Sequence, residues 1–182
     1  MSHNFHPTAK ISPLADLDRS IRGSILSIGE ASVVESFVRI KFSGGLGDVI
    51  IGENCNINSG TVIYSGHGVR LGKCVLIAAN CTLAASNHEY GDSTIPIREQ
   101  GLKPSKGGIV IDDDVWIASN CLILDGSHIG KGAVIGAGSL VRGVVAPYAV
   151  MGGNPLKLLD YRRGHGSPLL NHVSKIVTGG PR

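Results

Sequence analysis

Residues 111–141 read IDDDVWIASNCLILDGSHIGKGAVIGAGSLV, and a branched aliphatic side chain recurs there at every sixth position. The repeating positions are Ile111, Ile117, Ile123, Ile129, Ile135 and Val141. A period of six does not keep to one face of a helix, which has about 3.6 residues per turn, but it suits a short strand followed by a turn. The stretch therefore predicts stacked short strands.

The same step of six continues upstream, with interruptions. Its further members are Ile28, Val34, Ile40, Ile51, Ile57, Ile63, Leu71, Ile77 and Leu83. Three such units make one triangular coil of about 18 residues, and coils stack about 4.8 Å apart through parallel strand pairing. The pattern predicts an all-β solenoid of about five coils, in which each coil buries its faces against the next.

The repeat also accounts for three of the four cysteines. Cys55, Cys81 and Cys121 each stand four residues after a repeating aliphatic residue, where the pattern places a small side chain. We expect them to be buried as small core residues, since free cysteine commonly behaves as a small hydrophobic side chain. No CxxC pair occurs, so neither a redox motif nor a cysteine zinc site is indicated. Cys74 lies off the register.

The composition fits one domain filled with aliphatic side chains, since 42% of the 182 residues are hydrophobic but only 4% are aromatic. The net charge of +3 is too small to indicate a nucleic-acid-binding face. No apolar run approaches the roughly 20 residues of a membrane span, and the N-terminus lacks the apolar stretch of a signal peptide, so a cytoplasmic protein is expected. We expect residues 1–163 to form the domain and residues 164–182 a tail. Helix is expected near LLDYRR (158–163) and LLNHVSKIV (169–177).

The period fails between Leu83 and Ile111. The intervening residues contain Pro96 and Pro104 and many charges, so they predict a projecting loop over about residues 84–108. A loop beside a rigid scaffold is a common place for a functional site. His88 stands where the repeat breaks, and a histidine pKa of about 6.5 suits a general base.

Five motifs resemble those of hexapeptide-repeat acyltransferases, in particular the branch that acetylates sugar and polysaccharide hydroxyls, such as galactoside and maltose acetyltransferases. They are SNHEY (86–90), IPIREQG (95–101), VWIASN (115–120), VIGAGSLV (134–141) and GGNP (152–155). The resemblance covers about residues 50–163. It implies a left-handed parallel β-helix, acetyl-CoA as acyl donor without a metal, and a homotrimer whose active sites are shared between neighbouring subunits.

On the acceptor side, the resemblance implies that His88 is the catalytic base and that Asn58, Tyr90 and Trp116 contact the substrate. Asn58 could instead satisfy a turn. Trp116 is too large for the solenoid interior and could instead pack on the surface or in a subunit interface. Glu89 could orient His88, although a sequence neighbour points to the other side of a strand.

On the coenzyme side, Ser119, Ala137 and Gly138 match the family's positions for the pantetheine arm, where small residues let the arm approach the backbone. The phosphates of coenzyme A need cations, and Arg142 and Lys157 are candidates. Arg142 and Gly143 replace a Thr-Lys pair that is common in the family.

Three other functions are possible on this fold, and the sequence argues against two of them. An N-acyltransferase acting on a nucleotide-linked amino sugar would use the same fold and donor, and HPTAKI (6–11) resembles the start of several such enzymes. A zinc carbonic anhydrase on this fold needs two histidines close together, but no other histidine lies within twenty residues of His88. A non-catalytic scaffold would not need His88 or its loop. Acetyl transfer to a sugar hydroxyl is the preferred interpretation, with the N-acyltransferase second.

Overall fold

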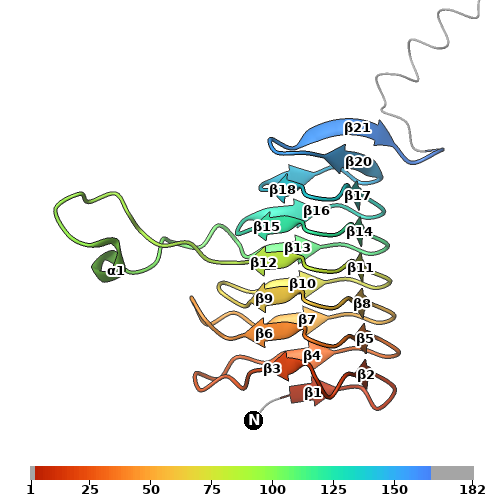
Figure 1. Cartoon of the computed structure of the whole chain (residues 1–182), viewed down its shortest axis with the longest axis horizontal. Helices are drawn as coiled ribbons and strands as arrows, with labels where there is room; N and C mark the ends of the chain where they lie inside the picture. The colour runs from red at the N-terminus through yellow and green to blue at the C-terminus, as the bar shows by residue number, and fades with distance from the viewer. Residues whose placement is uncertain (1–2, 165–182) are drawn as a thin grey trace, which may run out of the picture.

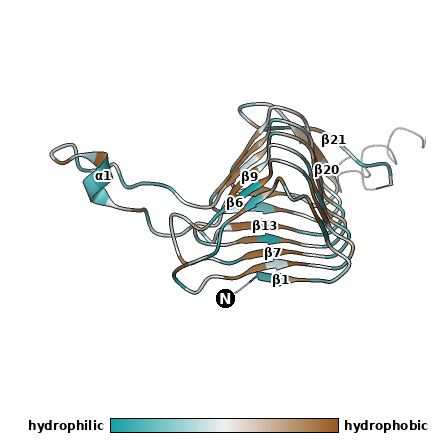
Figure 2. Ribbon diagram, turned by 60° about the horizontal axis from the view of Figure 1, so that its bottom comes forward, coloured by the Kyte–Doolittle hydropathy of each residue, from teal (hydrophilic) through white to brown (hydrophobic). Residues whose placement is uncertain are grey.

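The computed structural model describes residues 3–164, which form a left-handed parallel β-helix (Figure 1). Three sheets of seven, eight and six strands, here called sheets A, B and C, make the sides of a triangular prism (Figure 2). All pairings between these strands are parallel except the last, which joins β20 to β21. The expected fold class is confirmed.

The strands are short, and each sheet takes one strand from every coil. Sheet A contains β1 (His3–Phe5), β4 (Leu26–Ile28), β7 (Val49–Ile51), β10 (Val69–Leu71), β13 (Ile109–Ile111), β16 (Ser127–Ile129) and β19 (Val144–Val145). Sheet B contains β2 (Lys10–Ile11), β5 (Val33–Val34), β8 (Asn56–Ile57), β11 (Leu76–Ile77), β14 (Trp116–Ile117), β17 (Val134–Ile135), β20 (Ala149–Gly152) and β21 (Lys157–Tyr161). Sheet C contains β3 (Asp16–Leu17), β6 (Arg39–Lys41), β9 (Val62–Tyr64), β12 (Thr82–Ala84), β15 (Leu122–Leu124) and β18 (Leu140–Val141).

The register stacks the repeating aliphatic residues in columns inside the prism. In sheet A, Leu71 pairs with Ile51 on one side and with Ile111 on the other, and all three are buried. These columns stabilise the fold, because each Å² of apolar surface removed from water contributes about 25 cal/mol of favourable free energy. Cys55, Cys81 and Cys121 are buried free thiols, as expected, whereas Cys74 is exposed.

The expected number of coils was too low. Sheet C has six strands, so the described chain makes six complete coils, and β19 and β20 begin a seventh. The missed first coil follows the same step of six through Phe5, Ile11 and Leu17, which pack against the core. This coil is offset from the next because residues 18–25 separate Leu17 from β4.

The insertions gather at one edge of the prism, where each coil passes from sheet C to sheet A. Residues 18–25, 42–48, 65–68 and 85–108 all lie at this edge, called the C/A edge below. The longest is the expected loop, which projects from the prism and carries the short helix α1 (Ile97–Gln100) (Figures 1 and 2). Among residues 3–164, no helix is long and apolar enough to cross a membrane.

The helix expected near LLDYRR is wrong. Residues 157–161 form β21, which pairs antiparallel with β20 and covers the last edge of sheet B. An open strand edge offers a ladder of hydrogen bonds, and this tertiary pairing overrides the local helical pattern. The second expected helix, at residues 169–177, lies outside the described residues.

Candidate active site

A short antiparallel ribbon forms the base of the projecting loop. His88 is bridged to Leu102, the Glu89 N–H donates to the Gly101 carbonyl at 3.0 Å, and the Lys103 N–H donates to the Asn87 carbonyl at 2.9 Å. The ribbon ties the start of the loop to its end. The position of His88 is therefore fixed by backbone pairing although its side chain is exposed.

The ring of His88 makes one hydrogen bond that defines its chemistry. Nδ1 lies 3.2 Å from the carbonyl oxygen of Gly101. A carbonyl oxygen can only accept, so Nδ1 carries a proton, and in the neutral form of such a ring the lone pair lies on Nε2. This is the tautomer that a general base acting through Nε2 requires.

Gly101 has a backbone conformation that favours glycine. Its φ of 78° and ψ of −147° lie outside the regions that residues with a Cβ occupy. A Cβ built there would meet no atom within 4 Å, so the restriction is torsional and not steric crowding by neighbours. The conformation places one carbonyl to accept from both the Glu89 N–H and His88 Nδ1.

His88 opens onto a pocket of about 310 Å³ at the C/A edge. The other lining residues are Asn87, Tyr90, Lys103, Lys106, Leu124, Asp125 and Arg142. The Lys103 ammonium lies 3.5 Å from the centre of the Tyr90 ring and 3.8 Å from Glu89 Oε1. The structure thus brings together three of the expected site residues, His88, Tyr90 and Arg142.

Glu89 does not orient His88. Its carboxylate accepts the N–H groups of Tyr90 and Gly91 at 2.8 and 2.9 Å, and these bonds hold its pKa below the usual value, helped by Lys103. The carboxylate therefore shapes the turn after His88, and the Gly101 carbonyl takes the orienting role.

The remaining expected residues lie on other parts of the prism. Ser119, Ala137 and Gly138 stand at the edge between sheets B and C, where the Gly138 N–H donates to the Ser119 carbonyl at 2.9 Å. Asn58 lies on the same edge, two coils before Ser119, and its side chain donates to the Ile77 carbonyl at 2.9 Å. Within one chain this B/C edge is separate from the His88 pocket.

Two further residues belong to sheet B. Trp116 points outward from β14 with half of its surface exposed, in a hollow that it shares with Leu76 and Arg162. Lys157 begins β21 and is exposed. Neither residue lines the pocket that contains His88.

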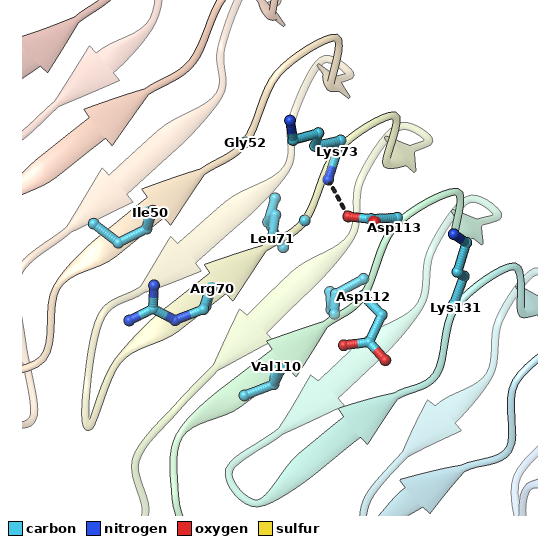
Figure 3. A pocket seen from close by; sticks show the side chains of 11 residues that line it. Ile50, Gly52, Arg70, Leu71, Lys73, Val110, Asp112, Asp113 and Lys131 are labelled. Carbon is cyan, nitrogen blue, oxygen red and sulfur yellow. Dashed lines mark hydrogen bonds between the residues drawn. The ribbon is translucent and has the colours of Figure 1, made fainter.

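A larger hollow of about 500 Å³ lies on the outer face of sheet A (Figure 3). Arg70, Lys73, Asp112, Asp113 and Lys131 line it around the apolar side chains of Ile50 and Val110, and the Lys73 N–H donates to Asp113. Its lining includes no histidine and no cysteine, and its titratable acids are Asp112 and Asp113. Among residues 3–164, no group of three or more His, Cys, Asp or Glu side chains could hold a metal ion.

The sequence matches known transferases. Residues 108–143 fit the family profile described as bacterial transferase hexapeptide (six repeats). The galactoside O-acetyltransferase of Escherichia coli K12 is 32% identical over 139 residues, and the putative lipopolysaccharide biosynthesis O-acetyl transferase WbbJ of the same strain is 30% identical over 120 residues. The chain belongs to the hexapeptide-repeat acetyltransferase superfamily. The aligned segments cover 76% and 63% of this chain, and 65% and 61% of those two relatives.

Solved structures extend the match in space. AntD, an N-acyltransferase from Bacillus cereus solved with dTDP-4-amino-4,6-dideoxyglucose and coenzyme A, superposes with a TM-score of 0.74 at 20% identity. That match covers 98% of this chain and 91% of AntD, so it includes the first coil. The acetyltransferase VCA0836 from Vibrio cholerae, solved with acetyl coenzyme A, gives a TM-score of 0.53 at 29% identity over 74% of this chain and 69% of that one.

Two pocket residues of this superfamily member were not expected from the sequence. Asp125 is buried, and its two carboxylate oxygens accept the N–H groups of Lys106 and Gly108 at 3.1 and 3.0 Å. In the sequence, Asp125-Gly126 is typical of a surface turn, and Lys106 is one charge among many in the loop. Their juxtaposition arises because coil stacking brings residues 17–19 positions apart together.

Proposed function

We propose that this chain is an acyltransferase that uses an acyl-coenzyme A donor, with His88 as its general base. The observation that carries the proposal is the His88 ring, which is fixed by the Gly101 carbonyl with Nε2 free and which faces a pocket. Nε2 takes the proton of the acceptor nucleophile as that atom attacks the thioester carbonyl. When the tetrahedral intermediate collapses, the coenzyme A sulfur leaves and the imidazolium returns the proton to it.

The reaction is direct transfer between two bound substrates. An acyl-enzyme is not proposed, because Cys55, Cys81 and Cys121 are buried in the prism, and the exposed Cys74 lines the hollow beside Trp116 and not the His88 pocket. The developing oxyanion needs a backbone donor. In the turn at Ala118 and Ser119, the Ala118 N–H already donates to the Ile135 carbonyl at 2.9 Å, so we assign this role to the Ser119 N–H.

The active site is proposed to form between subunits of a homotrimer. His88 and Tyr90 lie at the C/A edge, whereas Ser119, Ala137 and Gly138 lie at the B/C edge. A neighbouring subunit that brings its B/C edge to the His88 pocket would join the two halves. In such a site the three small residues line the pantetheine arm, Lys157 serves the phosphates, and Asn58 and Trp116 contact the acceptor.

The acyl donor is proposed to be acetyl-CoA. The relatives named above are acetyltransferases, and VCA0836 is described with acetyl coenzyme A. AntD has also been solved with 3-hydroxybutyryl-CoA, so a short hydroxyacyl group is the second choice for the donor.

Two acceptors fit the same base. A sugar hydroxyl is supported by the O-acetyltransferase relatives at about 30% identity. The amino group of a nucleotide-linked amino sugar has the stronger support, because the match to AntD includes the N-terminal coil and nearly the whole chain. We therefore place the amino sugar first, which reverses the order favoured by the sequence motifs.

A substrate panel tests this function. Purified protein is incubated with acetyl-CoA and, in turn, dTDP-4-amino-4,6-dideoxyglucose, galactosides and other sugars, and thiol release is recorded together with the mass of the product. The proposal expects thiol release that depends on the acceptor, with a product whose bond is an amide or an ester. Absence of acceptor-dependent release across nucleotide-linked amino sugars and free sugars would contradict it.

A further inference from the structure

The His88 pocket contains more positive charge than the proposed chemistry needs. Lys103, Lys106 and Arg142 line it together with His88. Lys103 is occupied by the Tyr90 ring and by Glu89. Among residues 3–164, neither the Lys106 ammonium nor the Arg142 guanidinium has an ion pair or a hydrogen bond. Two cations are therefore available to a ligand in the pocket.

The backbone at both cationic residues is fixed by hydrogen bonds or strand pairing. The Lys106 N–H is held by the buried carboxylate of Asp125 at 3.1 Å, which places Lys106 at the rim of the pocket. Arg142 directly follows β18, whose Val141 pairs with Ile123 in β15, so the ladder carries Arg142 beside Leu124. The Asp125 oxygens are taken up by two backbone N–H groups and do not neutralise either cation through a direct ion pair.

We propose that Lys106 and Arg142 bind a phosphate group of the acceptor, so that the enzyme selects a phosphorylated or nucleotide-linked acceptor over the free sugar. This inference rests on the proposed function. Arg142 offers a planar pair of donors that matches two phosphate oxygens, and Lys106 adds a mobile point charge.

Phosphates occur in both substrates, and the position of the pocket favours those of the acceptor. His88 must contact the nucleophile at the thioester carbonyl, so the reacting atoms lie in this pocket of about 310 Å³. The whole pantetheine arm separates the phosphates of coenzyme A from its thioester. A phosphate beside His88 therefore belongs to the acceptor. We accordingly assign Arg142 to the acceptor and not, as expected from the sequence, to the phosphates of coenzyme A.

Equilibrium binding tests the assignment without turnover. Calorimetry gives the Kd of dTDP, and separately that of coenzyme A, for the wild-type protein and for Lys106→Gln, Arg142→Gln and the double variant. Lys131→Gln is the matched control, because Lys131 is an exposed cation that lines the sheet A hollow and not this pocket. The probe dTDP carries the phosphates without a reactive group.

We expect each pocket variant to raise the Kd of dTDP about tenfold, as the loss of a charge-assisted hydrogen bond does. The Kd of coenzyme A should stay unchanged in these variants, and Lys131→Gln should bind both ligands as the wild type does. No binding of dTDP to wild type, equal affinity in all variants, or a selective loss of coenzyme A affinity would overturn the inference. Acyl transfer is scored separately by thiol release. If dTDP binding depends on the two cations but no acceptor is acylated, the proposed function fails while this phosphate site stands.

Discussion

At the scale of single residues, the site depends on a glycine as much as on the histidine. Gly101 adopts φ 78° and ψ −147° and thereby points one carbonyl at His88 Nδ1, 3.2 Å away. The position of His88 could be predicted from sequence because the hexapeptide period stops there. Its partner could not, because nothing in IPIREQG indicates which backbone atom will face the ring.

Gly101→Ala tests this partnership. A Cβ at these torsions costs about 1–3 kcal/mol, and relaxing that strain rotates the carbonyl away from Nδ1. We expect kcat to fall by roughly tenfold to hundredfold, since small misplacements of a catalytic group have effects of that size. Steady-state kinetics measure it. Gly91→Ala, in the same loop but without a positive φ, is the control, and equal losses in the two variants would argue against a specific role for Gly101.

At the scale of elements, the C/A edge is built from glycines that stack closely. A Cβ on Gly45 would overlap the Gly66 carbonyl, and a Cβ on Gly47 would overlap the backbone of Gly68. These residues lie in the two coils below the loop, so close backbone approach keeps the edge compact where the chain leaves the repeat. The loop that carries His88 projects from this edge.

Gly47→Ala is expected to lower the free energy of unfolding by about 1–3 kcal/mol, the range typical of overpacking. Denaturant unfolding measures the change. Gly136→Ala is the matched control, because a Cβ there would lie 3.4 Å from the Met151 carbonyl, an ordinary contact, and Gly136 has no positive φ. A Gly47→Ala protein as stable as the control would show that the edge can relax freely.

The buried cysteine Cys121 gives a second prediction at this scale. Cys121 is buried and its thiol donates to the Gly136 carbonyl at 3.2 Å, inside the prism. Cys121→Ala should lower stability by about 1 kcal/mol, the size of one lost hydrogen bond, and leave kcat per folded enzyme unchanged. Thermal unfolding and kinetics are measured together. A large loss of kcat at unchanged stability would mean that the thiol takes part in the chemistry.

The elements also mark how far the sequence predicts the fold. The six-residue period predicts the strands, their inward side chains and the long loop, because the pattern is local. The period missed the first coil, where residues 18–25 break the step. The separate expectation of a helix near residues 158–163 was wrong, because β21 lies there. β21 forms because sheet B would otherwise end in an open edge. The hydrogen bond from the Lys106 backbone N–H to Asp125 likewise depends on the stacking of coils, which a linear pattern does not contain.

At the scale of the whole molecule, most of the expected residues divide between two edges of one prism, and Trp116 and Lys157 lie on sheet B. His88, Tyr90 and Arg142 share a pocket at the C/A edge, while Ser119 and Gly138 stack on the B/C edge. Under the proposed function, a complete site therefore needs a second copy of the chain. Outward-facing Leu76 and Trp116, paired in register on sheet B and each about half exposed, supply apolar surface that such an assembly could bury.

The assembly prediction is a homotrimer with three equivalent sites. Light scattering coupled to size-exclusion chromatography should give three times the 18.9 kDa mass of the chain at concentrations where the enzyme is active. Trp116→Glu should shift the protein toward smaller species, since burying an unpaired charge in an apolar contact is unfavourable. A stable monomer with full activity would contradict the shared site.

The most direct measurement is the turnover of His88→Ala with acetyl-CoA and the true acceptor. Removal of a general base typically lowers the rate about 10²–10⁴-fold. We predict a fall in kcat of that order, with the oligomeric state and the affinity for coenzyme A unchanged, because the His88 side chain is exposed and makes only the bond to Gly101. If His88→Ala keeps nearly full turnover, His88 is not the base and the assignment of the active site is wrong.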